Sequence, residues 1–287
     1  MCYPALVQQP SDPSHDASKQ PRLSVVLPAR NEADNLPPLM NEIVEVLYTI
    51  GDSWEVVIVD DASTDHTKAV LTDLVELHPR LRALHVPPKR TNRGHGQSAA
   101  FRAGIAASRG DLIIMMDADG QNDPADIPRL LACYKARAGP VMIQGDRTRS
   151  RCDSWLRRMS SGVGWLTRRL MLGDTTRDTG CSLRLMPREL ALALPLEYTG
   201  MHRFIPITAE QFGWSVVIEH VHHRPRMAGR THYGISNRAW AGFVDCLAVR
   251  WMVRRRCLVE PTALELKHGA GVEQSPRNKV VKQKAAV

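Results

Sequence analysis

The sequence predicts an α/β protein with a mainly parallel sheet that is covered by helices on both faces. Short apolar runs alternate along the chain with longer segments in which apolar residues recur at helical spacing. The apolar runs are continuous, as is typical of strands that are buried on both faces. A chain of 287 residues is long enough for one large domain or two small ones.

The first strand is expected at Leu23–Pro28, where the sequence reads LSVVLP. A helix is expected at Asp34–Tyr48, because six apolar residues from Leu36 to Leu47 recur at helical spacing. The second strand is expected at Trp54–Asp60, in the run WEVVIVD. These elements form a strand–helix–strand unit, the connection that parallel strands need.

The next helix is expected at Thr64–Leu77, where Ser63 and Thr64 are candidates for the N-cap. The alternation then continues through a third strand, an alanine-rich helix and a fourth strand. These three elements are expected at Leu81–Val86, Gln97–Ser108 and Leu112–Met116.

Changes in composition mark the ends of the α/β domain, which is assigned to residues 21–235. Residues 1–20 are rich in Pro, Ser, Asp and Gln and are predicted to be a disordered lead-in. Residues 236–264 are predicted to form an amphipathic helix, which either packs on the domain or lies in a membrane interface. Residues 265–287 are predicted to be a basic disordered tail.

The charge and the cysteines limit the function classes. A net charge of +8 suits phosphates, nucleic acid or an anionic membrane surface without choosing among them. The six cysteines form no CxxC pair, so neither a zinc site nor a disulfide framework is indicated, and a cytoplasmic protein is expected. No signal peptide is evident, and the apolar stretch Ala239–Val253 is too short to cross a bilayer.

Polar residues follow three of the four strands at their carboxyl ends. They are PARNE at Pro28–Glu32, DDAST at Asp60–Thr64 and DADGQ at Asp117–Gln121. Open parallel sheets bind ligands in the crevice beyond this edge. An ordinary turn explains any one of these sequences, but three at the same edge favour a binding site.

Asp117 and Asp119 are separated by one small residue, so both carboxylates can face one point. Mg²⁺ or Mn²⁺ is commonly held by one or two carboxylates together with substrate phosphates, and Gln121 adds a neutral oxygen. We therefore expect a cation that bridges the phosphates of a nucleoside diphosphate, with a plain surface turn as the alternative. The segment GHGQSA at 94–99 fits a dinucleotide fingerprint, but it does not follow a strand directly and is rejected.

Six motifs now resemble one family in their order along the chain: LPARNEADNL, VDDASTDHT, RGDLIIMMDADGQNDPADIPRL, DTGCSLRLMPR, MHRFIP and HRPRMAGRTHYGISNR. They resemble the inverting glycosyltransferases of family 2, in the branch of dolichol-phosphate mannose synthases and polyprenyl-phosphate sugar transferases. The resemblance runs from Leu23 to Val253. It implies a GT-A fold (a Rossmann-like, mainly parallel sheet flanked by helices) as the catalytic domain, a nucleotide-sugar donor, and Mg²⁺ or Mn²⁺ as cofactor.

The resemblance also implies roles for individual residues. Donor-binding residues would be Pro28, Arg30, Glu32, Asp60, Asp61 and Asp117. The metal would be held by Asp117, Asp119 and Gln121, and the acceptor phosphate by Arg147, Arg157 and Ser161. Arg226 would lie on a loop that closes over the donor, in which Thr231 replaces the usual serine.

The chemistry of the acceptor can be weighed from the residues. A sugar hydroxyl needs a general base, whereas a phosphate monoester is largely ionised at pH 7 and needs positive charge. Residues 147–184 contain nine arginines and three aspartates, and TGMHRF at 199–204 offers His202 and Arg203 where hydroxyl-acting relatives carry a carboxylate. We therefore expect a phosphate acceptor, with Asp119, Arg147, His202, Arg203 and Arg226 as the catalytic group. His202 could instead be a capping or packing residue.

The expected reaction moves mannose from GDP-mannose to polyprenyl or dolichyl phosphate with inversion. UDP-linked glucose, N-acetylglucosamine or galacturonic acid, and a hydroxyl acceptor, are the alternatives. The expected location is the cytoplasmic face of the membrane, peripherally bound, with a possible small membrane-protein partner. A binding protein without catalysis is a weaker alternative, and no nucleic acid is expected because aromatic residues are only 5%.

Overall fold

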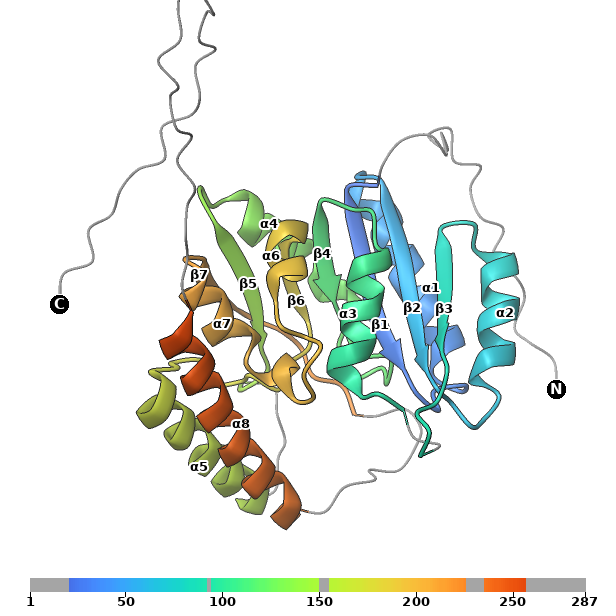
Figure 1. The fold of residues 1–287 in the computed structure, drawn as a ribbon. Coiled ribbons are helices and arrows are strands. Elements are labelled where there is room, and N and C mark those ends of the chain that lie inside the picture. The colour runs from blue at the N-terminus through green and yellow to red at the C-terminus, as the bar shows by residue number, and fades with distance from the viewer. Residues whose placement is uncertain (1–20, 92–93, 150–154, 226–234, 257–287) are drawn as a thin grey trace, which may run out of the picture. The chain divides into compact units, whose positions relative to one another are not determined.

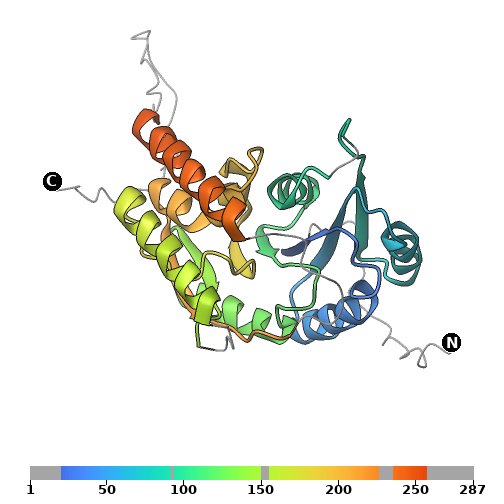
Figure 2. The same ribbon diagram turned by 90° about the horizontal axis from the view of Figure 1, so that it is seen from below.

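A computed structural model describes residues 21–91, 94–149, 155–225 and 235–256. Its centre is a seven-stranded sheet in the order β3-β2-β1-β4-β6-β5-β7, with helices on both faces (Figures 1 and 2). The strands are β1 (Leu23–Ala29), β2 (Trp54–Asp61), β3 (Leu81–Val86), β4 (Leu112–Met115), β5 (Val141–Asp146), β6 (Arg184–Pro187) and β7 (Ser215–His220). The sheet is parallel except for β6, which runs antiparallel to both β4 and β5.

The helices connect these strands. The longer ones are α1 (Leu36–Ile50), α2 (Thr67–Leu77), α3 (Gln97–Ala107), α4 (Ile127–Lys135), α5 (Trp155–Leu172) and α8 (Ile235–Arg255). The shorter ones are η1 (Pro124–Asp126), α6 (Arg188–Ala193), η2 (Met201–Arg203) and α7 (Ile205–Gln211). The predicted α/β class is confirmed, and the first four strands are present with ends that differ by at most one residue.

One helix start was predicted wrongly. The helix expected from Thr64 begins at Thr67, and its N-cap position, His66, makes no side-chain capping bond. Ser63 and Thr64 are used elsewhere, because both bond to Asn31 in the loop after β1. The predicted disordered ends, residues 1–20 and 265–287, lie outside the described residues.

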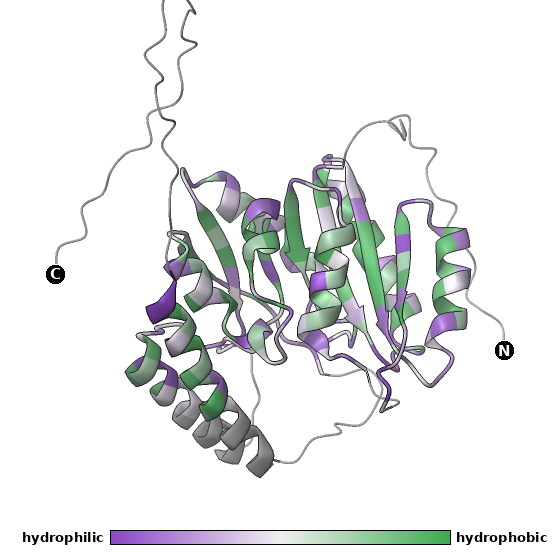
Figure 3. Ribbon diagram, viewed as in Figure 1, coloured by the Kyte–Doolittle hydropathy of each residue, from purple (hydrophilic) through white to green (hydrophobic). Residues whose placement is uncertain are grey.

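Alternation along the strands divides the core into two layers. On β1, Leu23, Val25 and Leu27 pack against one layer, with apolar residues of α1, α2 and α4. Val26 faces the opposite layer, where α3, α6, α7 and α8 contribute. The strands are largely apolar, whereas the loops at the edge where β1 and β2 end are hydrophilic (Figure 3). Helices therefore cover both faces of the sheet, and the loops at the edge where β1 and β2 end are hydrophilic.

Helix α8 both packs and exposes apolar surface. Cys246 and Val249 are buried in the core, so one face of the helix packs on the domain. Phe243, Leu247 and Trp251 on another face are exposed. None of the helices within the described ranges is long and apolar enough to cross a membrane.

Candidate active site

The loops after β1 and β2 are bonded to each other. The backbone N–H of Asn31 donates to Ser63 Oγ (2.9 Å), and Thr64 N–H donates to Asn31 Oδ1 (2.8 Å). Asn31 and Ala62 both have a φ of 56°. This left-handed backbone conformation is unfavourable for residues other than glycine. The two loops thus form one preorganised wall at the edge of the sheet. Of the predicted donor-binding residues in this wall, Arg30 is exposed, and Pro28 and Glu32 are half-buried.

The two aspartates at the end of β2 support other groups of the protein. Asp60 is 1% exposed; its Oδ1 accepts Ser63 N–H (3.0 Å), and its Oδ2 lies 2.8 Å from His85 Nδ1. Asp61 accepts the backbone N–H groups of His95 and Gly96, both at 2.7 Å. Asp61 therefore fixes the loop that leads into α3.

Asp117 and Asp119 follow β4, at the same edge. Gln97, the first residue of α3, donates from Nε2 to Asp117 Oδ1 (2.5 Å). Burial and then the charge of Asp119 raise the pKa of Asp117 to about 6, against the hydroxyl of Ser182 and nearby arginines. Two mutually repelling carboxylates fit a divalent cation, which would remove the repulsion.

The rest of the predicted metal motif is braced by its own backbone and by the segment after β7. Asp119 Oδ1 accepts the N–H of Gln121 (3.1 Å), and the carbonyl of Gln121 accepts Arg224 N–H (3.0 Å). No group of three or more His, Cys, Asp and Glu side chains that could hold a metal occurs in the described ranges. A cation at Asp117 and Asp119 would therefore need oxygens from the substrate and from Gln121.

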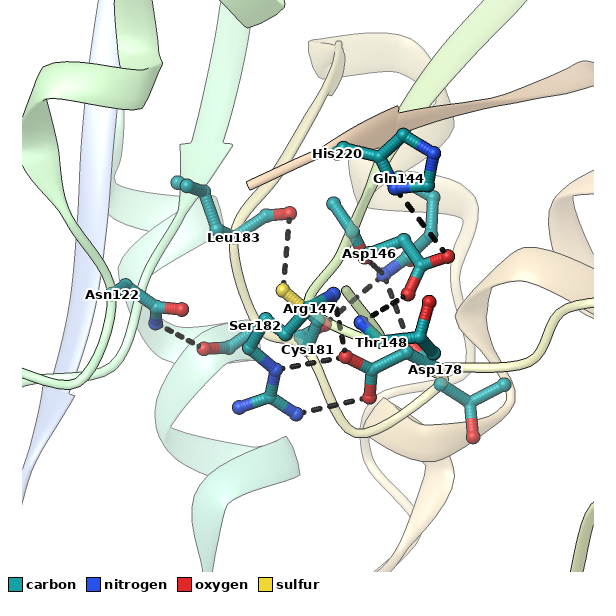
Figure 4. Close-up of polar contacts among 12 residues, drawn as sticks. Asn122, Gln144, Asp146, Arg147, Thr148, Asp178, Cys181, Ser182, Leu183 and His220 are labelled. Carbon is teal, nitrogen blue, oxygen red and sulfur yellow. Dashed lines mark hydrogen bonds and ion pairs between the residues drawn. The ribbon is translucent and has the colours of Figure 1, made fainter. Parts of the chain in front are cut away.

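Arg147, predicted to bind the acceptor phosphate, is held in a buried ion pair (Figure 4). Its Nε and Nη2 donate to the two oxygens of Asp178 (2.8 and 3.0 Å), and its backbone N–H donates as well (3.0 Å). Burial disfavours the charge, but the hydrogen bond and charge of Asp178 outweigh it and raise the pKa of Arg147. Its Nη1 points to the side away from Asp178 (Figure 4).

A second buried arginine, Arg184, was given no role from the sequence. It is 1% exposed, and it donates to Gln144 Oε1 (2.6 Å) and to the carbonyls of Thr179 (2.8 Å) and His202 (3.0 Å). Burial lowers its pKa to about 10, so it remains a cation at neutral pH. Its charge, like that of Arg147, acts on Asp117. The available signal was an arginine within the apolar run LRLMP.

His202 contacts the first turn of α3, next to Gln97, which bonds Asp117. Its Nδ1 is 2.8 Å from Ser98 Oγ, which also accepts its backbone N–H (3.1 Å). Burial, followed by the charges of Arg203 and Arg184, lowers the pKa of His202 to about 3. A neutral imidazole bonded to the first turn of α3 agrees with the packing alternative, and with this lowered pKa the ring is a weak base near pH 7. Arg203 is half-buried beside it.

The remaining predicted residues are placed only in part. Arg157 and Ser161 lie on α5, and nothing is described of their side chains. Arg226 and Thr231 lie outside the described residues. Asn122 and His223 form an isolated bridge, so the segment that leads toward Arg226 starts beside the metal motif.

The chain is similar to one protein family and to a named relative. The model of the family named glycosyl transferase family 2 matches residues 24–193. The undecaprenyl-phosphate 4-deoxy-4-formamido-L-arabinose transferase of Enterobacter sp. (strain 638) is 35% identical over 215 residues, 74% of this chain. The match spans 62% of the length of that relative.

Solved structures share the fold at low identity. Glucosyl-3-phosphoglycerate synthase from Mycobacterium tuberculosis, in complex with Mg²⁺ and UDP, has a TM-score of 0.59 at 19% identity, over 80% of this chain and 79% of that one. A mannosyltransferase from Pyrobaculum calidifontis, in complex with GDP-Man and Mn²⁺, has a TM-score of 0.53 at 19% identity, over 88% and 70%. These matches confirm the predicted GT-A fold. The family model covers more than half of this chain, and the chain therefore belongs to glycosyl transferase family 2.

Proposed function

We propose that this glycosyltransferase moves a sugar from a nucleotide-sugar donor to polyprenyl phosphate, forming a lipid-linked monophosphosugar. The observation that carries the proposal is the charge around Asp117. Two buried arginines, Arg147 and Arg184, act on it, while the nearby His202 is neutral and Asp178 is occupied by Arg147. Such a site favours an anionic acceptor over one that must lose a proton. The 35% identical relative, named for undecaprenyl phosphate, supports the same acceptor class.

In the proposed reaction, an oxygen of the lipid phosphate attacks the anomeric carbon of the sugar. The bond from this carbon to the donor diphosphate breaks on the opposite face, so the configuration inverts. Asp117, Asp119 and Gln121 would hold Mg²⁺ or Mn²⁺, which supplies positive charge for the departing nucleoside diphosphate. The wall formed by the β1 and β2 loops would bind the nucleoside through Pro28, Arg30 and Glu32. The buried Asp60 and Asp61, predicted as donor-binding residues, would support this wall and the loop before α3.

The acceptor phosphate would be held by Arg147, Arg157 and Ser161, with Arg203 lining the site and Arg226 closing over the donor. These cations match the dianionic charge of a phosphate monoester. Substitution of Asp119 by alanine is expected to abolish transfer without unfolding the chain. Full activity in that variant would overturn the assignment of the metal motif.

A hydroxyl acceptor remains the second candidate because of one carboxylate, Asp245 on α8. Burial raises the pKa of Asp245, against the charge of Arg203. Its Oδ2 would lie 2.7 Å from a Cβ placed at Gly200, next to the segment that carries His202. The variant Asp245→Asn separates the two candidates. Loss of transfer with normal folding would identify Asp245 as a base, and retained transfer supports the phosphate acceptor.

The donor is tested directly by label transfer into lipid that is extractable with organic solvent. Purified protein, polyprenyl phosphate and Mn²⁺ would be mixed in turn with GDP-mannose, UDP-glucose, UDP-N-acetylglucosamine, UDP-galacturonic acid and UDP-linked 4-deoxy-4-formamido-L-arabinose. GDP-mannose was the donor expected from the sequence, whereas the name of the similar relative supports a modified arabinose. Label released only as free water-soluble sugar would overturn the lipid acceptor and keep the donor site.

The lipid acceptor requires contact with a membrane, and we propose that α5 and α8 provide it at the cytoplasmic face. The two helices run side by side (Figures 1 and 2), and Arg250 of α8 donates to the carbonyl of Met171 at the end of α5. Their exposed large apolar side chains are Leu166 and Leu170 on α5, and Phe243, Val244, Leu247 and Trp251 on α8. Arg169 and Arg254 add positive charge, which suits anionic lipid headgroups.

Flotation with vesicles of phosphatidylcholine and phosphatidylglycerol tests this surface. The variant Leu170→Glu is expected to reduce binding, because this leucine is 74% exposed on α5. Leu77→Glu on α2, also at an exposed leucine, is the matched control and should bind as the native protein does. No binding by the native protein would instead favour a small membrane-protein partner.

A further inference from the structure

The most informative unassigned side chain is His85, near the end of β3. It lies opposite Asp60 in the register of β2 and β3, so it stands at the same sheet edge as the loops that follow β1 and β2. None of the motifs that resemble the family includes it. Its side chain is 41% exposed, whereas that of Asp60 is 1% exposed. At this edge the imidazole, rather than the carboxylate behind it, is the group that faces outward.

Asp60 sets the position and the tautomer of the His85 imidazole. One carboxylate oxygen accepts the N–H of Ser63 (3.0 Å), and the other lies 2.8 Å from His85 Nδ1. A carboxylate only accepts hydrogen bonds, so in the neutral ring the proton must be on Nδ1. The opposite nitrogen, Nε2, then carries a lone pair and is a hydrogen-bond acceptor. Asp60 therefore fixes the tautomer as well as the orientation of the ring.

A ring acceptor of this kind distinguishes between nucleobases. Uracil and guanine carry a hydrogen on a ring nitrogen, N3 and N1 respectively, and each can donate it to Nε2. Cytosine and adenine have an unprotonated acceptor nitrogen at the corresponding position, which would oppose the lone pair of Nε2. A hydrogen-bonding site rejects a ligand that cannot complete its bond more strongly than an apolar site rejects a poor fit.

We propose that His85 is a specificity-determining residue of the donor site. It accepts the ring N–H of the donor base, with Asp60 as the positioning residue that sets its tautomer. The proposal rests on the proposed function and narrows it, because it restricts the donor to uridine or guanosine diphosphate sugars.

The test is the affinity of the full chain for UDP, GDP, CDP and ADP with Mn²⁺, measured by calorimetry. The native protein should bind UDP or GDP at least about ten-fold more tightly than CDP or ADP. His85→Phe should lose most of this preference while the chain stays folded, with some loss of thermal stability because Asp60 Oδ2 loses its hydrogen-bond partner. His66→Phe, the same change at an exposed histidine next to α2, is the control and should keep the preference.

Two further measurements exclude a merely structural effect. The preferred nucleotide, methylated at its ring nitrogen, should bind the native protein about ten-fold more weakly, with little further loss in His85→Ala, where the acceptor is gone. Asp60→Asn can place its amide N–H₂ against the ring and reverse the tautomer, so the preference against CDP should fall. Equal preferences in the native protein and His85→Phe would overturn the inference. A chain that binds none of the four nucleotides would instead overturn the proposed function itself.

Discussion

Replacement of Asp178 by alanine should strongly destabilise the protein, because it would leave Arg147 charged and buried without its partner. The side chains of Arg147 and Asp178 are 9% and 2% exposed, and three hydrogen bonds of 2.8–3.0 Å join the two residues. Removing one partner of such a pair typically costs about 3–5 kcal/mol. This loss of stability comes from the buried charge that is left without a counter-charge, so it should largely disappear when both residues are replaced by apolar ones.

The double variant Arg147→Met/Asp178→Leu therefore completes a cycle with its two single variants. The free energy of unfolding would be measured by denaturant titration for all four proteins. Each single variant should lose about 3–5 kcal/mol, and the pair should show a coupling energy of about 2 kcal/mol or more. Losses below about 1 kcal/mol, or strict additivity, would refute the buried ion pair. If Arg147 also contacts the acceptor phosphate, the folded double variant should still lack transfer.

Three further predictions follow from single contacts. The pKa of His202 is about 3 in the folded chain and about 6.5 in the unfolded chain. As pH falls below 6.5 the unfolded state therefore takes up a proton before the folded state does. The free energy of unfolding should then fall, by about 2 kcal/mol at pH 5. Denaturant titration of His202→Gln should show a flatter pH dependence; an unchanged slope contradicts the assignment. Gln97→Ala should weaken Mn²⁺ affinity about ten-fold by calorimetry with folding intact, because Gln97 orients Asp117; native affinity would exclude that role. Gly104→Ala should lower stability by about 1–3 kcal/mol in thermal unfolding, because the added Cβ would lie 2.4 Å from a methyl group of Val26. An unchanged stability would contradict this packing.

The sequence by itself determined the first four strands, the helices between them and the polar loops at their carboxyl ends. These features are local. A continuous apolar run such as WEVVIVD or LIIMM indicates a strand buried on both faces, whatever its position in the sheet. The carboxylates that follow such runs are therefore easy to recognise in the sequence. The parallel arrangement follows from the connections alone, so the edge that carries Asp60, Asp117 and Asp119 could be predicted.

Only the tertiary structure decided which side chains these groups meet. β6 lies antiparallel between β4 and β5, and this brings Arg184 and the loop before it against Asp117. The pairing of Arg147 with Asp178 and of His85 with Asp60 joins residues 31 and 25 positions apart. Periodicity along a chain carries no information about such partners, because strand order and packing across the sheet select them. The sequence therefore identified the polar residues of the loops at the sheet edge. It did not identify Arg184 or His85, nor which residues are exposed contacts and which are buried supports.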